Sequence, residues 1–328
     1  MPYSGTVSQT VFDTRRVIEN AARRCRVPPQ SLTAEHIDVA KDQLFLLLSD
    51  LSNRGMQLWC IQKSIYPLYE GQAQIVTDLG TVDVLNGNLR SLKDLTGAVT
   101  TSATAYTTSF AGPVAVSTVG VQGDNSGVPL VFERSADEVV WTQVGSITPQ
   151  TEAGEWFWFD IDSVKPGRFF RVRATSGTPD FSRVIFGNNP TEIPLARLNR
   201  DDYTNLPNKT FQSNRPLQYW LDRQTRSPVL NLWPVPNAGA ETSQIVLWVQ
   251  RHIMDVGAMT QEIEVPQRWY EAIVAQLAAR LALEYMEVDP QLIPILDSKA
   301  AQSLAIAMIE ERDNSPVNLL PDISMYTR

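Results

Sequence analysis

The clearest hydrophobic pattern in the chain is a leucine-rich stripe over residues 37–51. Apolar residues recur there with the 3.6-residue spacing of an α-helix that buries one face. Thr33 stands where an N-cap residue is expected, and Gly55 stands where a left-handed residue would end the helix. The stripe therefore predicts a helix of about five turns that packs against other helices.

Three other segments, all near the chain ends, show the same period. Residues 13–26 predict a short helix that Pro28 ends. Near the C-terminus, Pro266 suits the first turn of a long helix, and a second amphipathic helix is expected over 292–312. Because the leucine stripe has suitable helical partners only there, we expect the N- and C-terminal helices to form one bundle. The residues of the last helix expected to point inward are Leu296, Ala300, Leu304, Ala307 and Met308.

Shorter runs of aromatic and β-branched residues lie between the helical ends. Within residues 194–251, three such runs at 217–221, 229–233 and 245–250 are separated by prolines and by Asn-Ala-Gly turn chemistry. They predict a small antiparallel sheet, and residues 58–76 are expected to add early strands to it.

Residues 96–190 are rich in serine, threonine, glycine and valine and show no helical period. Strand-like runs separated by turns about every 8–15 residues predict an all-β sandwich. Turns are expected at Asn86-Gly87 and at 188–191, where the chain returns to the small sheet. The expected strands of the sandwich are 114–121, 130–133, 141–144, 156–160 and 168–174.

These patterns together predict an α+β protein with an inserted β domain. A bundle of N- and C-terminal helices and a small antiparallel sheet would form the core, from residues 1–95 and 191–313. Residues 96–190 would form an inserted all-β jelly-roll or sandwich domain. Residues 314–328 contain two prolines and no period, so we expect an extended C-terminal tail that docks on a partner.

Composition and charge narrow the classes of function. The chain has 328 residues, 43% of them hydrophobic, which allows a sizeable core. Its formal net charge is −8, so a tight grip on nucleic-acid phosphates is not expected. No apolar run is long enough to cross a bilayer, and we expect no membrane partner. Cys25 and Cys60 have no metal-binding spacing and are expected to be buried thiols in a protein that folds in a reducing compartment.

Residue patterns for catalysis and for ligand ions are weak. The two histidines, His36 and His252, lie outside any hydrolase or metal-binding motif. We therefore expect no catalytic residue, no cofactor and no metal site, and we predict a protein that is not an enzyme. Asp160 and Asp162 form a same-face carboxylate pair, for which a solvated strand edge is favoured over a calcium site.

Two tryptophans are the candidate ligand-contacting residues of the insert. Trp156 and Trp158 alternate with phenylalanines along one expected strand, so they share one of its faces. That face is a candidate either for stacking on a glycan or for packing between subunits.

Part of the insert resembles a known module. Ser135-x-Asp137, a following Trp141-Thr-x-Val run and Arg-Phe-Phe-Arg-Val-Arg at 168–173 resemble the jelly-roll of discoidin and galactose-binding type. The resemblance covers about half of the insert. The glycine usual in that family after the aspartate is Glu138 here. The resemblance implies a sandwich; many such modules bind sugars at loop tips, and others are spacers.

The segments on either side of the insert resemble another family. The motifs are Arg-Asp-Asp-Tyr at 200–203, Arg-Pro at 215–216, the Leu-x-Leu-x-Pro-x-Pro form of 230–236 and Pro-x-x-Trp at 266–269. Their order is similar to that of the head-to-tail adaptors of short-tailed bacteriophages, also called portal–tail connectors or tail tubular protein A. The insert departs from the shortest members of this family.

The adaptor resemblance implies a virion protein at the head–tail junction, made in the host cytoplasm. It implies a ring, a dodecamer in that family, that joins the portal protein to the tail nozzle protein and lets DNA pass during ejection without sequence-specific binding. The insert is a candidate contact for a tail fibre. The candidate portal-docking residues are Arg15, Arg16, Arg23 and Arg24 in the first helix and Leu319, Leu320, Ile323, Met325 and Tyr326 in the tail.

A different class of function remains open from the residues alone. In this alternative, the protein is a carbohydrate- or receptor-binding virion protein that works through the β-sandwich. A cell-wall hydrolase is a third and weaker hypothesis.

Overall fold

A computed structural model describes residues 12–54, 58–162, 164–240, 242–254, 256–284 and 288–311. The chain is α+β, and its sheets are mostly antiparallel. It divides into two compact units: a helical unit of residues 1–61 and 251–328, and a β unit of residues 62–250.

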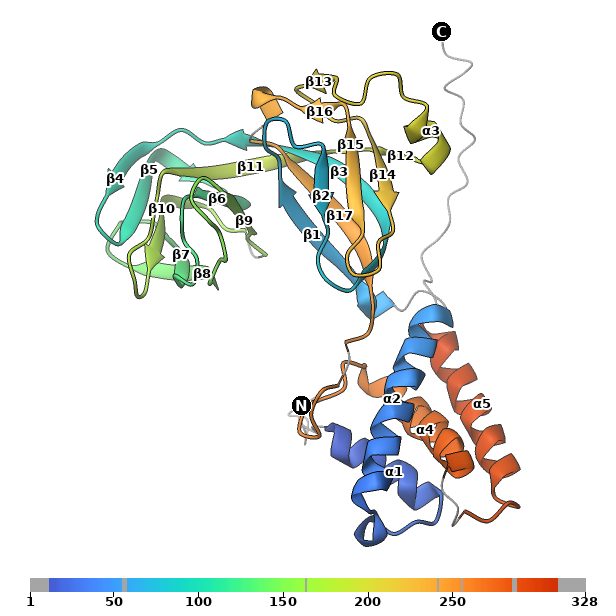
Figure 1. Ribbon diagram of the computed structural model, residues 1–328. Coiled ribbons are helices and arrows are strands. Elements are labelled where there is room, and N and C mark those ends of the chain that lie inside the picture. Colours follow the sequence, from blue (N-terminus) through green and yellow to red (C-terminus); the bar gives the residue numbers. More distant parts are fainter. Residues whose placement is uncertain are drawn as a thin grey trace. The chain divides into compact units, whose positions relative to one another are not determined.

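Four helices of the helical unit share one hydrophobic core. Helix α4 lies between α2 and α5, and α1 also packs on α4 (Figure 1). Helix α4 is buried over most of its surface, which fits its alanine-rich composition, because small side chains let neighbouring helices approach closely. The helices are α1 (Thr14–Arg24), α2 (Ala34–Arg54), α4 (Tyr270–Glu284) and α5 (Ile293–Glu310).

Local capping explains where the first two helices begin. The Asp13 carboxylate accepts a hydrogen bond from the backbone N–H of Arg16 at 2.9 Å, and the Thr33 hydroxyl accepts one from His36 at 3.2 Å. The leucine stripe of α2 is buried as predicted, and so are the thiols of Cys25 and Cys60. The inward position predicted for Met308 is wrong: its side chain is 45% exposed, because it lies beside a groove between α4 and α5.

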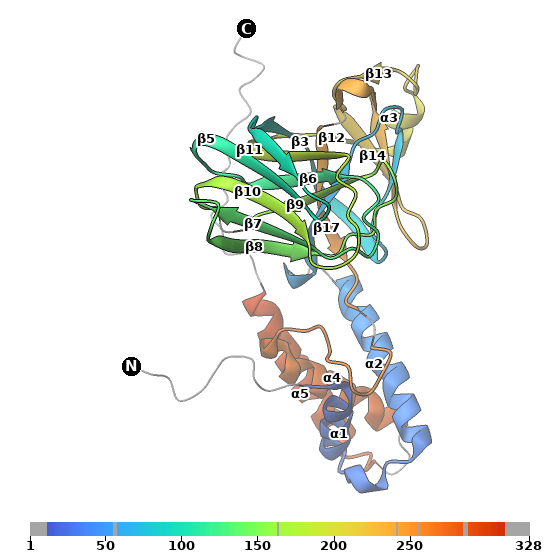
Figure 2. The same cartoon turned by 90° about the vertical axis from the view of Figure 1, so that its left-hand side faces the viewer.

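The described strands of the β unit form two larger and two smaller sheets. Figure 2 shows β5, β10, β7 and β8 side by side in the five-stranded sheet. The six-stranded sheet has the order β1 (Ile61–Pro67), β17 (Gln244–Arg251), β3 (Thr81–Asp94), β11 (Arg183–Pro194), β6 (Thr118–Gln122) and β9 (Trp156–Asp160). The five-stranded sheet has the order β4 (Ala98–Thr101), β5 (Ala105–Val114), β10 (Gly167–Ala174), β7 (Leu130–Ser135) and β8 (Trp141–Ile147). The four-stranded sheet has the order β12 (Ala196–Leu198), β14 (Gln218–Asp222), β15 (Val229–Trp233) and β2 (Gln74–Val76). The two-stranded sheet pairs β13 (Gln212–Ser213) with β16 (Val235–Pro236). A short helix, α3, spans Arg200–Thr204.

Two long strands occupy places where the sequence predicts turns. The expected turn at Asn86-Gly87 lies inside β3 instead. A side chain at Gly87 would begin 3.0 Å from the ring of Tyr219, so glycine here serves close packing of two sheets.

The expected return loop at 188–191 lies inside β11. Two residues, Asn189 and Pro190, stand opposite the single Leu92 of β3, which is a β-bulge. Asn189 has a positive φ of 46°, a conformation that asparagine tolerates well, and the bulge needs no ladder N–H from proline. Strand β11 therefore accommodates both Asn189 and Pro190, which the sequence analysis expected to interrupt it.

The six-stranded sheet contributes to two hydrophobic cores. Its β1, β17 and β3 strands pack with β14 and β15 around Tyr219 and Leu247, while β11, β6 and β9 pack with β5, β7 and β10 around Phe132 and Val172. The compact units accordingly differ from the predicted domains: residues 62–95 and 191–250 belong with the sandwich residues and not with the helices. The pairing of β3 with β11 on both sides of the bulge is the physical reason.

Candidate functional site

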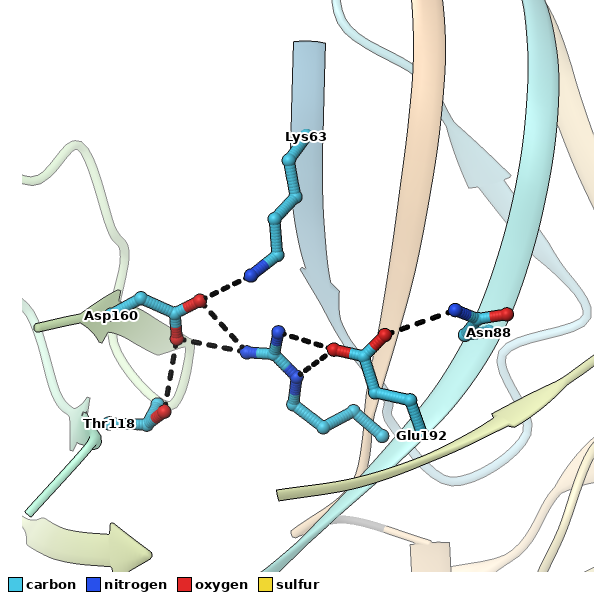
Figure 3. Close-up of polar contacts among 6 residues, drawn as sticks. Lys63, Asn88, Thr118, Asp160 and Glu192 are labelled. Carbon is cyan, nitrogen blue, oxygen red and sulfur yellow. Dashed lines mark hydrogen bonds and ion pairs between the residues drawn. The ribbon is translucent and has the colours of Figure 1, made fainter. Parts of the chain in front are cut away.

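The region where the two β cores meet contains a buried ion-pair network. Arg90 on β3 is directly opposite Glu192 on β11, and its guanidinium lies between two carboxylates. It donates to Asp160 at 2.9 and 3.0 Å and to Glu192 at 2.6 and 3.0 Å, while its side chain is only 4% exposed. The network is completed by Lys63, Thr118 and Asn88 (Figure 3).

The partners of Arg90 come from strands of both β cores. The ammonium of Lys63 on β1 lies 2.6 Å from Asp160 on β9, and the hydroxyl of Thr118 on β6 donates to the same carboxylate at 3.0 Å. The amide of Asn88 on β3 donates to Glu192 at 3.0 Å. Strand β9 lies at the edge of its sheet and Asp162 is exposed, as predicted. The solvation predicted for Asp160 is wrong, because its carboxylate is only 28% exposed and is paired with two cations.

The cations of this network hold both carboxyl groups ionised. Burial is the largest single effect on Asp160 and opposes ionisation, but hydrogen bonds from Lys63 and Arg90 together outweigh it, and its pKa is lowered. The pKa of Glu192 is lowered in the same way, with burial opposed by hydrogen bonds from Arg90 and Asn88. The arrangement stabilises a fixed contact and leaves neither carboxylate poised for proton transfer near neutral pH.

The two candidate tryptophans of β9 lie beside this network and are buried. Trp156 is 3% exposed and Trp158 is 7% exposed, and their rings stack with centroids 5.0 Å apart. They pack against Ile65, Tyr69 and Leu92, which belong to the part of the unit outside the insert. This burial corrects the expectation of an accessible face: the rings make a contact within one chain and are covered against a sugar or a second subunit.

The predicted portal-docking residues occupy different environments. Arg15, Arg16 and Arg23 are exposed on α1, whereas Arg24 is half-buried and pairs with Glu271 at 2.5 Å. The five candidate residues of the tail, at 319, 320, 323, 325 and 326, lie outside the described residues. The last described residue before the tail is Glu311.

Glu311 fixes the end of α5. Its carboxylate is buried and accepts hydrogen bonds from the backbone N–H of Leu58 at 2.9 Å, the guanidinium of Arg268 at 2.6 Å and the indole N–H of Trp269 at 3.3 Å. The chain beyond α5 therefore starts from a point that is held by the rest of the helical unit.

The helical unit exposes apolar side chains that the sequence analysis did not single out. On α5, Ile295 is 52% exposed, Ile306 is 56% exposed and Ile309 is 60% exposed. A groove of about 500 Å³ runs between α4 and α5 and is lined partly by Leu283, which is 71% exposed. The isoleucines recur at helical spacing outside the predicted inward stripe, which is the signal that could have revealed this surface.

The sandwich presents a polar and aromatic cluster on its five-stranded sheet. The Arg171 guanidinium lies 4.0 Å from the ring of the half-buried Trp141, and it also donates to Glu133 at 2.7 Å. Arg173 donates to the other oxygen of Glu133 at 3.2 Å. Burial opposes ionisation of Glu133, but the hydrogen bonds from Arg173 and Arg171 outweigh it and its pKa is lowered.

Three findings on the described residues concern acidic and histidine clusters, helix length and the two thiols. There, no group of three or more histidine, cysteine, aspartate or glutamate side chains is arranged to hold a metal ion. No described helix is long and apolar enough to span a bilayer. Burial raises the pKa of the Cys25 and Cys60 thiols to about 11.

Comparisons with known proteins give partial structural matches. No protein-family model and no curated protein matches the chain. A glycoside hydrolase structure is 17% identical over 25% of this chain and 17% of its own, with a TM-score of 0.19.

Further matches include carbohydrate-binding modules. A CBM32 module of CpGH89 from Clostridium perfringens is 17% identical over 38% of this chain and 94% of its own, with a TM-score of 0.20. The family 32 module of NanJ from C. perfringens, in complex with galactose, is 14% identical over 40% and 92%, with a TM-score of 0.21. At these TM-scores the likeness carries no inference about what this chain binds.

Proposed function

We propose that this protein is a structural assembly subunit that works through its helical unit. The observation that carries the proposal is the exposed apolar surface of α4 and α5, which includes Leu283, Ile306 and Ile309. Leu283 and Met308 are exposed at the α4–α5 groove, whereas Ile306 and Ile309 are exposed on α5 outside its lining. Exposed apolar side chains of this kind are typical of a protein–protein contact, because burying them removes apolar area from water at about 25 cal/mol per Å².

The adaptor resemblance gives this subunit its proposed place. The protein would form a ring, a dodecamer in that family, between the portal and the tail nozzle of a short-tailed bacteriophage, with DNA passing through the lumen. The net charge of −8 supports passage of DNA without adhesion, since like charge repels phosphates. The exposed arginines of α1 and the tail from residue 314 are the proposed portal contacts.

The experiment mixes the purified full chain with the portal protein of the same virus. We expect a ring-sized complex by light scattering and electron microscopy, and we expect its loss when residues 315–328 are deleted. The deletion variant should keep the unfolding transition of the full chain, since Glu311 is anchored before the deletion begins. A portal that stays unoccupied at micromolar concentrations of the full chain would contradict the proposal.

A second candidate function is binding of a carbohydrate by the sandwich, favoured by the cluster at Trp141. A half-buried indole beside an arginine offers an aromatic surface and a hydrogen-bond donor to a sugar. Glu133 is 10% exposed and holds Arg171 and Arg173 in place. This site replaces the Trp156–Trp158 face, which is covered.

The test is a glycan array and calorimetry on the full chain, with Trp141→Ala as the binding variant. A sugar that binds the native chain should bind this variant at least about tenfold more weakly, since losing a stacked ring costs more than about 1.4 kcal/mol. Trp248→Ala, which removes an exposed ring on β17, is the matched control and should leave binding unchanged. If no glycan binds the native chain, this second candidate is excluded.

A further inference from the structure

The groove between α4 and α5 leaves apolar side chains open to solvent. The two helices lie side by side in both views (Figures 1 and 2). At the groove, Leu283 is 71% exposed and Met308 is 45% exposed, and alanines such as Ala301 and Ala305 form much of the remaining lining. We call this surface the α4–α5 groove. Exposed apolar surface of this kind is typical of a place that another segment or another protein covers.

The chain leaves the helical unit at one end of the α4–α5 groove. The indole N–H of Trp269, just before α4, donates to Glu311, just after α5, at 3.3 Å, so the two helices run antiparallel. The lining of the groove extends along α5 from Met308, one turn before Glu311, to Asp297. This length is about 17 Å at the rise of an α-helix. Residues 312–318 alone can reach back about 23 Å, so the residues beyond them have the length to lie along the whole groove.

The tail suits the groove in polarity and in charge. Its apolar residues, which would face the alanines of the groove, are Leu319, Leu320, Ile323, Met325 and Tyr326. Within residues 314–328, Arg328 is the only base and Asp322 is the only acid. The groove's own base, Arg280, is already paired with Asp50 of α2 at 2.8 Å. A tail that runs back along α5 brings Arg328 to the far end of the groove, where Asp297 is exposed, and this pairing of opposite charges favours that direction.

A second groove of the helical unit suits the tail less. It has a volume of about 310 Å³, and Ile295 and Lys299 line it together with the paired Arg24 and Glu271. Lys299 would oppose Arg328 there, because like charges repel. The lining of this groove on α5 also ends at Lys299, about 18 Å along the helix from the point where the tail begins.

We propose that residues 319–328 of this chain dock in the α4–α5 groove of the same chain when the portal is absent. The docked tail covers Leu283 and Met308 and closes the groove to other copies. Binding of the tail to the portal withdraws it and opens the groove, so assembly begins on the portal and not in solution. The docking itself does not depend on the adaptor function; only its role in assembly rests on that proposed function.

The test uses a fluorescein-labelled peptide of residues 315–328 and measures its binding by fluorescence anisotropy. A chain that lacks residues 315–328 should bind the peptide with a Kd of about 0.1 mM or tighter. At that affinity, an effective concentration of about 1 mM keeps the attached tail of the full chain mostly docked. The full chain should therefore bind the peptide about tenfold more weakly. Binding to the shortened chain weaker than about 1 mM, or equal binding to both chains, would overturn the proposal.

Two matched variants of the shortened chain locate the binding site. Ala305→Glu places a carboxylate in the groove and should weaken peptide binding at least about tenfold, because the docked peptide would bury that charge without a partner. Gln302→Glu adds the same charge at an exposed position of α5 outside the groove lining and should leave binding unchanged. Urea unfolding of both variants confirms that each is folded. Equal effects of the two substitutions would mean that the peptide binds elsewhere and would reject the assigned groove.

Light scattering separates docking within one chain from docking between copies. The full chain should be a monomer at micromolar concentration. A dimer that disappears when residues 315–328 are deleted would show that the tail docks on a second copy, and it would overturn the proposal.

This test and the portal experiment fail independently. A ring-sized portal complex formed by a chain whose groove binds no peptide would reject the docking and keep the adaptor function. Peptide binding in the groove of a chain that never binds the portal would keep the docking and reject the adaptor function.

Discussion

Replacing Arg90 with methionine is expected to lower the free energy of unfolding by about 3 kcal/mol. The substitution removes the guanidinium while keeping an apolar stem of similar length. Asp160 and Glu192 then lose four hydrogen bonds from Arg90 in a site where water does not fully replace them. Asp160 keeps Lys63 and Thr118 as partners, which limits the loss.

The measurement is urea unfolding at pH 7 of the native chain and the variant, followed by tryptophan fluorescence. Lys63→Met is the matched control, because it removes the more exposed cation from the same carboxylate, and it should cost about 1 kcal/mol or less. Equal losses for the two variants would mean that the buried position of Arg90 does not matter.

Acid should reduce the difference between the native chain and Arg90→Met. The pKa values of Asp160 and Glu192 are lowered in the folded protein, so their stabilisation is present above the unfolded values near 4. It is lost as the pH falls through the lowered folded values. The stability difference should therefore be constant from about pH 7 to 5 and should shrink below about pH 4.

Replacing Trp158 with alanine is expected to cost about 3–5 kcal/mol. The ring is 7% exposed, stacks on Trp156 and lies directly over β6, where a side chain at Gly120 would begin 2.4 Å from it. Removing the indole leaves a cavity that the neighbouring strands cannot fill without breaking their pairing with β9.

The same unfolding measurement checks this result. Trp141→Ala removes an indole of equal size from the half-buried cluster on β8 and should cost about 1 kcal/mol. If Trp158→Ala cost no more than Trp141→Ala, the Trp156–Trp158 pair would not be a packed contact. A glycan that bound the native chain and was lost only in Trp158→Ala would also contradict the covered position of this pair.

Together, the ion-pair network and the Trp156–Trp158 pair join the sandwich to the hydrophobic core around Tyr219 and Leu247. Strands β3 and β11 belong to the six-stranded sheet that both hydrophobic cores share. Arg90 and Trp158 lie where these two cores meet. In the proposed assembly, the sandwich would therefore move with the small sheet, which matters if it contacts a tail fibre.

The sequence by itself determined the positions of α1, α2, α4 and α5 and of several strands. The leucine stripe of α2, the strand β15 and the strand β9 follow from local period and residue type, because side-chain burial in one element repeats with that element's own geometry. Asp13 and Thr33 mark helix starts for the same local reason. The adaptor resemblance and the portal contacts stay predictions.

Only the tertiary structure decided what those elements touch. Arg90 pairs with Asp160, 70 residues away in sequence, and with Glu192, 102 residues away. A local hydrophobic period cannot predict contacts over such separations. The same holds for Trp156 and Trp158, whose alternation fixed a shared face but not what covers it. The exposure of the isoleucines on α5 also depends on tertiary structure. Because α5 is apolar on more than one side, its sequence does not show which side faces solvent until the neighbouring helices are known.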